Sequence, residues 1–334
     1  MTDPTSNGTD AASAPIPPAT AVGLPTTAIE RTPLVVPPIV SADGLARQLA
    51  GPPPVEGGTV RVVDVRYYLD GRSGREAYEA GHIPGAVFVS LDDVLASPAS
   101  PEAGRHPLPT PEVFAAGLGA AGIGDNDVVV AYDDLRGMVA GRLVWMLRIL
   151  GRSAAVLDGG LDAWPGKPAT GPADPPPEPV ERQVLPWPGE ATVDADEVAD
   201  AIAAGELVID ARAAERYRGE TEPIDPRAGH VPGAVNLPFP TNLDADGRFR
   251  SLDELAAGYA SLGIGAATDG DEGGDGGEGG DTAPIVYCGS GVSACHHAVA
   301  MEAATGRRPR VYVGSWSQWS SDPDRPAATG DGAG

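Results

Sequence analysis

The sequence has little cysteine, little basic charge and no long apolar run. Only Cys288 and Cys295 occur among its 334 residues, too few for disulfides to hold the fold together, as is usual in a reducing cytoplasm. The 23 basic and 47 acidic residues give a net charge of -24, which lacks the basic surface that a nucleic-acid partner needs and disfavours anionic membranes. No apolar run approaches the roughly 18 residues of a membrane span, and the first residues lack the basic and apolar regions of a secretory signal. We therefore expect a cytoplasmic protein that binds neither nucleic acid nor membrane.

Four landmarks occur twice in the same order, which indicates an internal repeat. The motif Gly-His-Ile-Pro-Gly-Ala-Val at 81–87 returns as Gly-His-Val-Pro-Gly-Ala-Val at 229–235. The other pairs are 62–66 with 208–212, 128–133 with 285–288, and 159–164 with 314–319. The repeat predicts two domains of ordinary size. We divide the chain into a disordered tail 1–33, a first domain 34–170, a proline-rich linker 171–190, a second domain 191–323 and a disordered tail 324–334.

An insertion rich in Gly, Asp and Glu at 266–282 interrupts the second copy. The first copy has only the short segment 124–127 at that place, and loops accept added residues at small entropic cost. Repeated Asp and Gly could also bind calcium, but the spacing lacks the EF-hand pattern that ends in a Glu. We therefore expect a flexible, solvated loop, and we expect neither a metal nor a cofactor in the protein.

Short apolar runs alternate with helical stretches in each copy. In the first copy the pattern predicts helices at 111–121, with Thr110 as N-cap and Pro111 in the first turn, and at 139–150. Strands are predicted at 60–65, 128–132 and 154–157. Continuous apolar strands that alternate with helices indicate an α/β fold with a mainly parallel sheet and helices on both faces. In such sheets ligands bind at the carboxyl ends of strands.

Cys288 lies at such a strand end, between the apolar run 285–287 and the small-residue loop Gly-Ser-Gly-Val-Ser-Ala at 289–294. A loop of small residues can curl so that its backbone N–H groups converge on one anion, and the start of the following helix adds positive potential. Both effects favour a thiolate, which is the nucleophilic form of cysteine. A buried structural cysteine is the alternative.

These motifs, in this order, resemble the tandem rhodanese-like sulfurtransferases over about 35–319. Besides the paired landmarks, the resemblance depends on the motifs at 105–109, 216–223, 288–295 and 314–319. The family implies a non-catalytic first copy, and Asp133 stands where that copy would need its nucleophile. Thiosulfate-using members place basic residues after the cysteine. The neutral Gly289 and Ser290 resemble the 3-mercaptopyruvate type instead, with Ser293 in place of its usual threonine.

The resemblance implies that the Cys288 thiolate takes sulfur from 3-mercaptopyruvate and forms a persulfide. A thiol such as thioredoxin, or cyanide, would then accept the outer sulfur. The loop residues Gly289, Gly291, Val292 and Ser293 would hold the negative sulfur by their backbone amides, as an oxyanion hole does. Cys295 is expected to pack in the helix that follows.

The family also implies a relay of serine, histidine and aspartate beside the cysteine. Ser290 matches the serine, and we assign His82 and Asp70 to the other two positions. A structural His82 is the alternative, because His230 occupies the same motif in the second copy.

Two arginines bind the substrate carboxylate in this family. Arg216 matches the first and Arg227 is our candidate for the second, whereas Arg212 is expected to be structural because Arg66 repeats it.

The sequence leaves three alternatives to this function to compare with it. A thiosulfate sulfurtransferase would use the same persulfide, and a non-enzymatic rhodanese-like binding module would need no cysteine. A dual-specificity phosphatase needs an arginine six residues after its cysteine, where this chain has Ala294.

Overall fold

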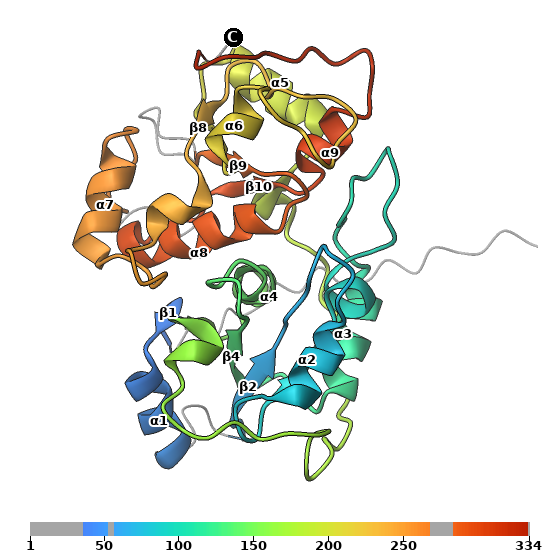
Figure 1. Ribbon diagram of the computed structural model, residues 1–334, viewed down its shortest axis with the longest axis vertical. Helices are drawn as coiled ribbons and strands as arrows, with labels where there is room; N and C mark the ends of the chain where they lie inside the picture. Colours follow the sequence, from blue (N-terminus) through green and yellow to red (C-terminus); the bar gives the residue numbers. More distant parts are fainter. Residues whose placement is uncertain (1–35, 53–56, 268–282, 333–334) are drawn as a thin grey trace, which may run out of the picture. The chain divides into compact units, whose positions relative to one another are not determined.

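Two parallel sheets of five strands organise the structure, a computed structural model that describes residues 36–52, 57–267 and 283–332 (Figure 1). The described residues belong to one compact unit, Thr32–Gly334. The predicted tail 1–33 lies outside them, as does nearly all of the predicted insertion 266–282.

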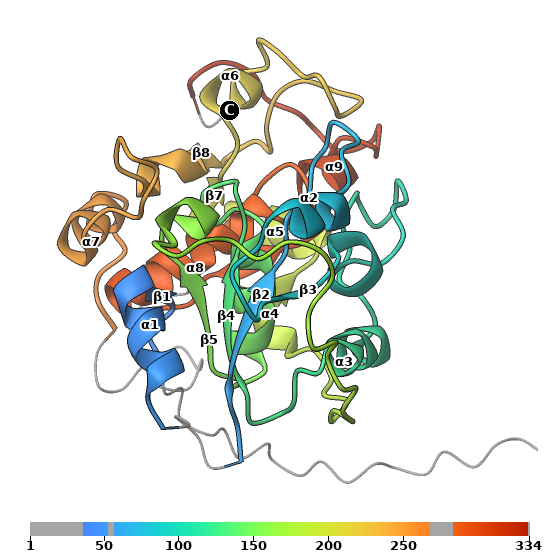
Figure 2. The same cartoon turned by 60° about the horizontal axis from the view of Figure 1, so that its bottom comes forward.

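The first sheet has the strand order β1-β5-β4-β2-β3. Its strands are β1 Ile39–Val40, β2 Val60–Asp64, β3 Val87–Phe88, β4 Val128–Tyr132 and β5 Ala154–Leu157. Its helices are α1 Ala42–Ala50, α2 Gly74–Ala80, the π-helix η1 Leu91–Leu95, α3 Pro111–Ala120, α4 Ala140–Ile149 and the 3-10 turn η2 Gly160–Ala163. Figure 2 shows β2, β4 and β5 running side by side through this domain.

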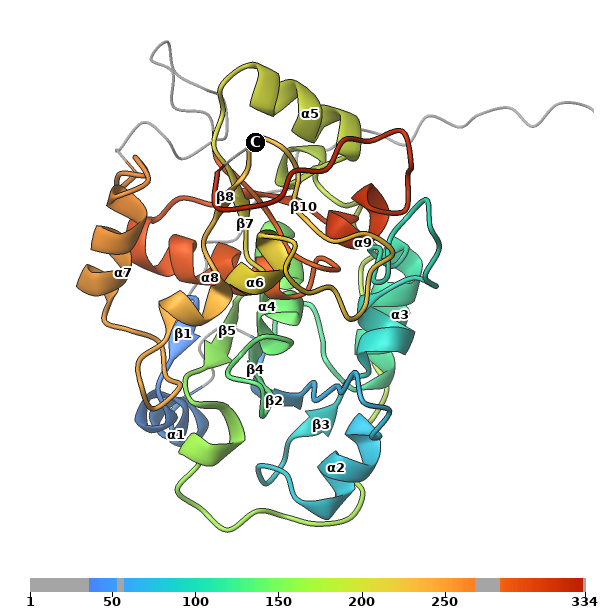
Figure 3. The same cartoon turned by 45° about the horizontal axis from the view of Figure 1, so that its top comes forward.

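The second sheet repeats this topology in the order β6-β10-β9-β7-β8. Its strands are β6 Thr192–Val193, β7 Val208–Asp210, β8 Val235–Asn236, β9 Ile285–Tyr287 and β10 Arg310–Tyr312. Its helices are η3 Gly189–Ala191, α5 Ala195–Ala203, α6 Ala214–Tyr217, η4 Phe239–Asn242, α7 Leu252–Ala260, α8 Ser293–Thr305 and α9 Ser315–Trp319 (Figure 3).

The predicted α/β class is confirmed, because all strand pairings in both sheets are parallel. The central strands β4 and β9 are buried along their whole length, as continuous apolar runs require. The Thr110 hydroxyl caps α3 by accepting a hydrogen bond from the Val113 N–H, with Pro111 in the first turn.

Helices α4 and α8 pack against each other and join the two domains through one hydrophobic core. All ten residues of α4 are buried. A Cβ atom at Gly141 would lie 3.0 Å from the Cα atom of His296, so the small residue permits this close contact. Because α8 begins at the Cys288 loop, this packing brings the first domain directly behind that loop.

The segment after 324, predicted to be a disordered tail, instead pairs with the second domain over the residues that the structure describes. Ala328 and His230 exchange two backbone hydrogen bonds, each of 2.9 Å. The Trp319 indole also donates to the carbonyl of Pro326 at 2.7 Å. The prediction from composition was wrong here, because backbone hydrogen bonds leave no side-chain pattern in the sequence.

Within the described ranges, no helix combines the length and the apolar character that crossing a bilayer requires.

Candidate active site

Cys288 lies directly after β9, at the carboxyl end of the central strand of the second sheet. Its Sγ accepts hydrogen bonds from the backbone N–H of Gly291 at 3.1 Å and of Ser290 at 3.5 Å. The cysteine is 1% exposed. Two converging N–H groups stabilise a negative sulfur more than a neutral thiol.

Gly291 gives the loop its sharp curl. Its φ is +75°, and a Cβ atom there would lie 2.4 Å from the carbonyl oxygen of Val313. Any other residue would push the loop outward and turn the N–H of Gly291 away from the sulfur. Val292 follows at the N-cap position of α8, and Ser293 is the first residue of that helix.

Ser290 meets a histidine from the other domain. Its Oγ lies 2.9 Å from Nδ1 of His106, and both residues are largely buried. Burial, reinforced by the nearby charges of Arg142 and Arg105, lowers the pKa of His106 to about 4. The imidazole is therefore neutral near pH 7 and can exchange a proton with the hydroxyl.

His82, our predicted relay histidine, does not contact Ser290. Its Nδ1 lies 2.9 Å from the carbonyl of Tyr78, and its ring stacks on the Tyr78 ring with centroids 4.0 Å apart. His230 makes the same contacts with Tyr217 in the second domain. The duplicated motif thus has a duplicated structural role, and His106 occupies the position that we assigned to His82.

Asp70, our predicted relay aspartate, lies on the surface. Its side chain is 58% exposed and pairs with Arg72 at 2.9 Å. The backbone N–H of Arg72 and then its guanidinium lower the pKa of the carboxyl by donating hydrogen bonds to it. A different carboxylate, Asp92, lines a cavity of about 280 Å³ together with His106 and Tyr67. Burial raises the pKa of Asp92. The sequence contained the signal for His106, since it lies in the family-like motif 105–109, which has no repeat in the second copy.

Two arginines flank the Cys288 loop at Gly289. A Cβ atom built on Gly289 would lie 3.0 Å from Nη2 of Arg105 and 3.4 Å from Nη1 of Arg216. Arg216 therefore lies beside the loop, and its role in binding a carboxylate stays a prediction. Arg105 comes from the first domain, and its backbone N–H donates to the Ser317 hydroxyl at 3.0 Å.

Arg227, our second predicted carboxylate ligand, is instead a structural cation. Its guanidinium donates to four backbone carbonyls at and beyond the end of α9, those of Trp319, Ser320, Asp322 and Arg325. Because the guanidinium N–H groups of Arg227 already bind backbone carbonyls, the arginine that lies beside Arg216 at Gly289 is Arg105. The structural role predicted for Arg212 is confirmed, because Arg212 pairs with Asp210 as Arg66 pairs with Asp64.

A fully buried arginine connects the loop to the first domain. Arg142 on α4 donates to the carbonyl of Gly291 at 2.9 Å and to that of His106 at 3.0 Å. One side chain thereby fixes both the residue whose N–H faces the sulfur and the histidine that faces Ser290.

The corresponding loop of the first domain binds its own carboxylate. Asp133 follows β4 as Cys288 follows β9, and it is completely buried. Its two oxygens accept four backbone hydrogen bonds of 2.7 to 2.8 Å, from Leu135, Gly137, Val139 and Ala140. This nest is therefore filled from within and cannot receive a substrate anion.

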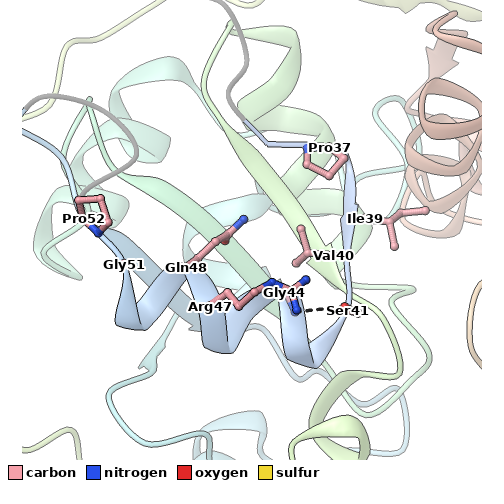
Figure 4. Close-up of a pocket in the computed structure, with 9 residues that line it drawn as sticks. All are labelled: Pro37, Ile39, Val40, Ser41, Gly44, Arg47, Gln48, Gly51 and Pro52. Carbon is pink, nitrogen blue, oxygen red and sulfur yellow. Dashed lines mark hydrogen bonds between the residues drawn. The ribbon is translucent and has the colours of Figure 1, made fainter.

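A larger pocket of about 510 Å³ lies elsewhere, between β1 and α1 (Figure 4). Its lining includes Ile39, Arg47 and Gln48 but none of the candidate site residues. The smaller cavity, by contrast, is lined by Arg105 and His106, which contact residues of the Cys288 loop.

Comparisons with known proteins agree with this geometry. The family model for the rhodanese-like domain matches residues 43–167 and again 194–322. A probable 3-mercaptopyruvate sulfurtransferase of Pseudomonas aeruginosa is 39% identical over 306 residues, which cover 88% of this chain and 98% of that protein. A putative thiosulfate sulfurtransferase, SseB, of Mycobacterium tuberculosis is 40% identical over 285 residues, 82% of this chain and 92% of that one.

A solved structure shows the same likeness. The 3-mercaptopyruvate sulfotransferase SseA of Escherichia coli superposes with a TM-score of 0.66 at 30% identity, covering 84% of this chain and 99% of that one.

Proposed function

This chain belongs to the rhodanese-like family and is a sulfurtransferase, and we propose that it moves sulfur from 3-mercaptopyruvate to a thiol such as thioredoxin, or to cyanide, through a persulfide on Cys288. One observation carries the proposal, namely the Sγ of Cys288 facing two backbone N–H groups at the end of a central strand. The free thiols of Cys288 and Cys295 support a reducing cytoplasm as its location.

In the first half-reaction the Cys288 thiolate forms a bond to the sulfur of the donor. The carbon–sulfur electron pair leaves with the three-carbon fragment as an enolate, and the proton of the donor thiol ends on that carbon, which gives pyruvate. Ser290 and the neutral His106 lie where they can carry this proton. The anionic outer sulfur of the persulfide remains on Cys288.

In the second half-reaction the acceptor thiolate attacks the outer sulfur. The sulfur–sulfur bond breaks, its electron pair stays on Cys288, and the acceptor leaves as a persulfide. The N–H groups of Ser290 and Gly291 face the Sγ of Cys288, which is the negative sulfur before the first half-reaction and again after the second.

Thiosulfate is the second candidate donor, favoured by the two guanidinium groups beside Gly289. The loop itself offers a dianion no positive side chain, since Gly289 and Ser290 are neutral. We therefore favour the donor with a single carboxylate.

Paired initial rates test the donor, with cyanide as acceptor. We expect kcat/KM for 3-mercaptopyruvate to exceed that for thiosulfate by about tenfold or more, because an uncharged loop attracts a dianion much less than a loop with two basic residues would. A preference for thiosulfate would overturn the donor assignment, and the lack of a protein persulfide with either donor would overturn the mechanism.

The relay predicts different effects for the two histidines. His106→Gln should lower kcat with 3-mercaptopyruvate by about 100-fold, the usual contribution of a proton-transferring group. His82→Asn should lower the melting temperature while kcat changes little, because the His82 ring stacks on Tyr78 and bonds to its carbonyl, away from Ser290. Equal losses of kcat in the two variants would contradict the assignment of His106.

The pH profile gives an independent check of His106. Its pKa in the folded protein is about 4, below the usual value, so protonation should abolish proton transfer only near pH 4. We expect kcat to hold from pH 7 down to about 5 and then fall, and this limb should be lost in His106→Gln. A limb near pH 6.5 would show that the imidazole is not shielded from water as described.

A further inference from the structure

A cluster of four charged side chains covers the Cys288 loop. Arg105 and Arg216, which flank Gly289, both bind Asp225. Arg216 Nη2 lies 3.0 Å from the Asp225 carboxylate and 2.7 Å from that of Glu222. The carboxylate of Asp225 thus bridges an arginine of the first domain to one of the second.

Both carboxylates are almost inaccessible to water, while the arginines are partly open. The side chains of Asp225 and Glu222 are 2% and 4% exposed, against 24% and 17% for Arg105 and Arg216. Ion pairs shielded in this way are little weakened by salt. The Nε–H of Arg105 is also buried and finds no acceptor among the residues described, so one donor of the cluster remains for a ligand.

The charges of the cluster cancel. Glu222 also binds Arg212, which pairs with Asp210, so three guanidinium groups face three carboxylates. An incoming anion therefore meets a neutral group of residues rather than a positive one. A single substrate carboxylate can replace one oxygen of Asp225 on an arginine and use the free Nε–H of Arg105. A dianion would add a second negative charge close to a buried carboxylate, which is strongly unfavourable where water is excluded.

We propose that Asp225 is a specificity-determining residue that holds Arg105 and Arg216 and thereby selects donors with a single carboxylate over dianionic thiosulfate. The proposal rests on the sulfurtransferase function proposed above. The choice of donor then depends on the charge of Asp225, in the segment after α6, as well as on the neutral residues that follow Cys288.

The test compares kcat/KM for thiosulfate and for 3-mercaptopyruvate in the wild type and three variants, at constant ionic strength. Asp225→Asn removes the charge and keeps the size of the side chain. Asp225→Glu keeps the charge, and Asp70→Asn makes the same chemical change in an exposed ion pair. Asp225→Ser replaces Asp225→Asn as the neutral variant if the latter does not fold.

We expect the ratio of thiosulfate to 3-mercaptopyruvate kcat/KM to rise about tenfold or more in Asp225→Asn. The ratio should stay near the wild-type value in Asp225→Glu and in Asp70→Asn. A ratio that is unchanged or lower in folded Asp225→Asn, with the wild type active, overturns the role of Asp225 and leaves the proposed function intact. If the wild type forms no persulfide with either donor, the proposed function and this proposal fall together.

Discussion

Replacing Cys288 by serine is expected to lower kcat/KM with 3-mercaptopyruvate by about 10⁴-fold or more, as the loss of a catalytic nucleophile does. A serine oxygen cannot form the sulfur–sulfur bond, and a hydroxyl is a much weaker nucleophile than the sulfur of a thiolate. Mass spectrometry of the intact protein after mixing with donor should show the gain of one sulfur atom in the wild type and none in Cys288→Ser.

Cys295→Ser is the matched control for this experiment. Cys295 is fully buried, its Sγ donates to the carbonyl of Gly291 at 3.2 Å, and burial raises its pKa to about 12. It therefore remains a thiol, and a serine hydroxyl can donate to the same carbonyl. We expect Cys295→Ser to form the persulfide. Loss of the persulfide in Cys295→Ser, or its retention in Cys288→Ser, would show that the wrong sulfur has been assigned.

Asp133→Ala is expected to lower the free energy of unfolding by about 4 kcal/mol, although Asp133 lies in the copy without the nucleophile. The substitution leaves four N–H groups without their acceptor, three of them buried and that of Leu135 partly buried, and each such group costs about 1 kcal/mol or more. Chemical denaturation measures the change. The effect should also reach the active site, because Ala140, which donates to Asp133, is the first residue of α4, and Arg142 lies in the same helical turn.

Asp70→Ala is the control for Asp133→Ala. Asp70 pairs with Arg72 in solvent, where ion pairs contribute little to stability. We expect its denaturation midpoint to match that of the wild type. An Asp133→Ala protein with a wild-type midpoint would mean that water, or another group, satisfies the N–H groups of the nest.

The fold could be predicted because its signals are local and occur twice. The run at 128–132 is apolar throughout, as a strand covered on both faces must be, and Thr110 caps α3 through its own hydroxyl. The nest around Cys288 could be predicted for the same reason, since its donors are the next residues of the chain.

The partners across the domain interface could not be predicted in this way. His106 meets Ser290 although 184 positions separate them, and their contact depends on how α4 packs against α8. The motif around His82 is easier to recognise in the sequence than the one around His106, and it therefore favours His82. Its repetition at His230 indicates a structural role that both copies share.

The prediction that Arg227 is the second carboxylate ligand was wrong for a related reason. Arg227 was chosen for its position after Arg216, but whether its side chain turns toward the loop or toward α9 depends on the course of the segment between them.

The buried contact of Arg142 with Gly291 makes the two copies of the repeat depend on each other. The first copy has Asp133 where the second has Cys288. Three residues of the first copy nevertheless contact residues at the Cys288 loop of the second copy, namely His106, Arg105 and Arg142. The second copy expressed alone would possess a reactive sulfur but neither a proton carrier nor a support for its loop. The two halves of the chain therefore depend on each other, and a substitution in the first copy can disturb the loop of the second.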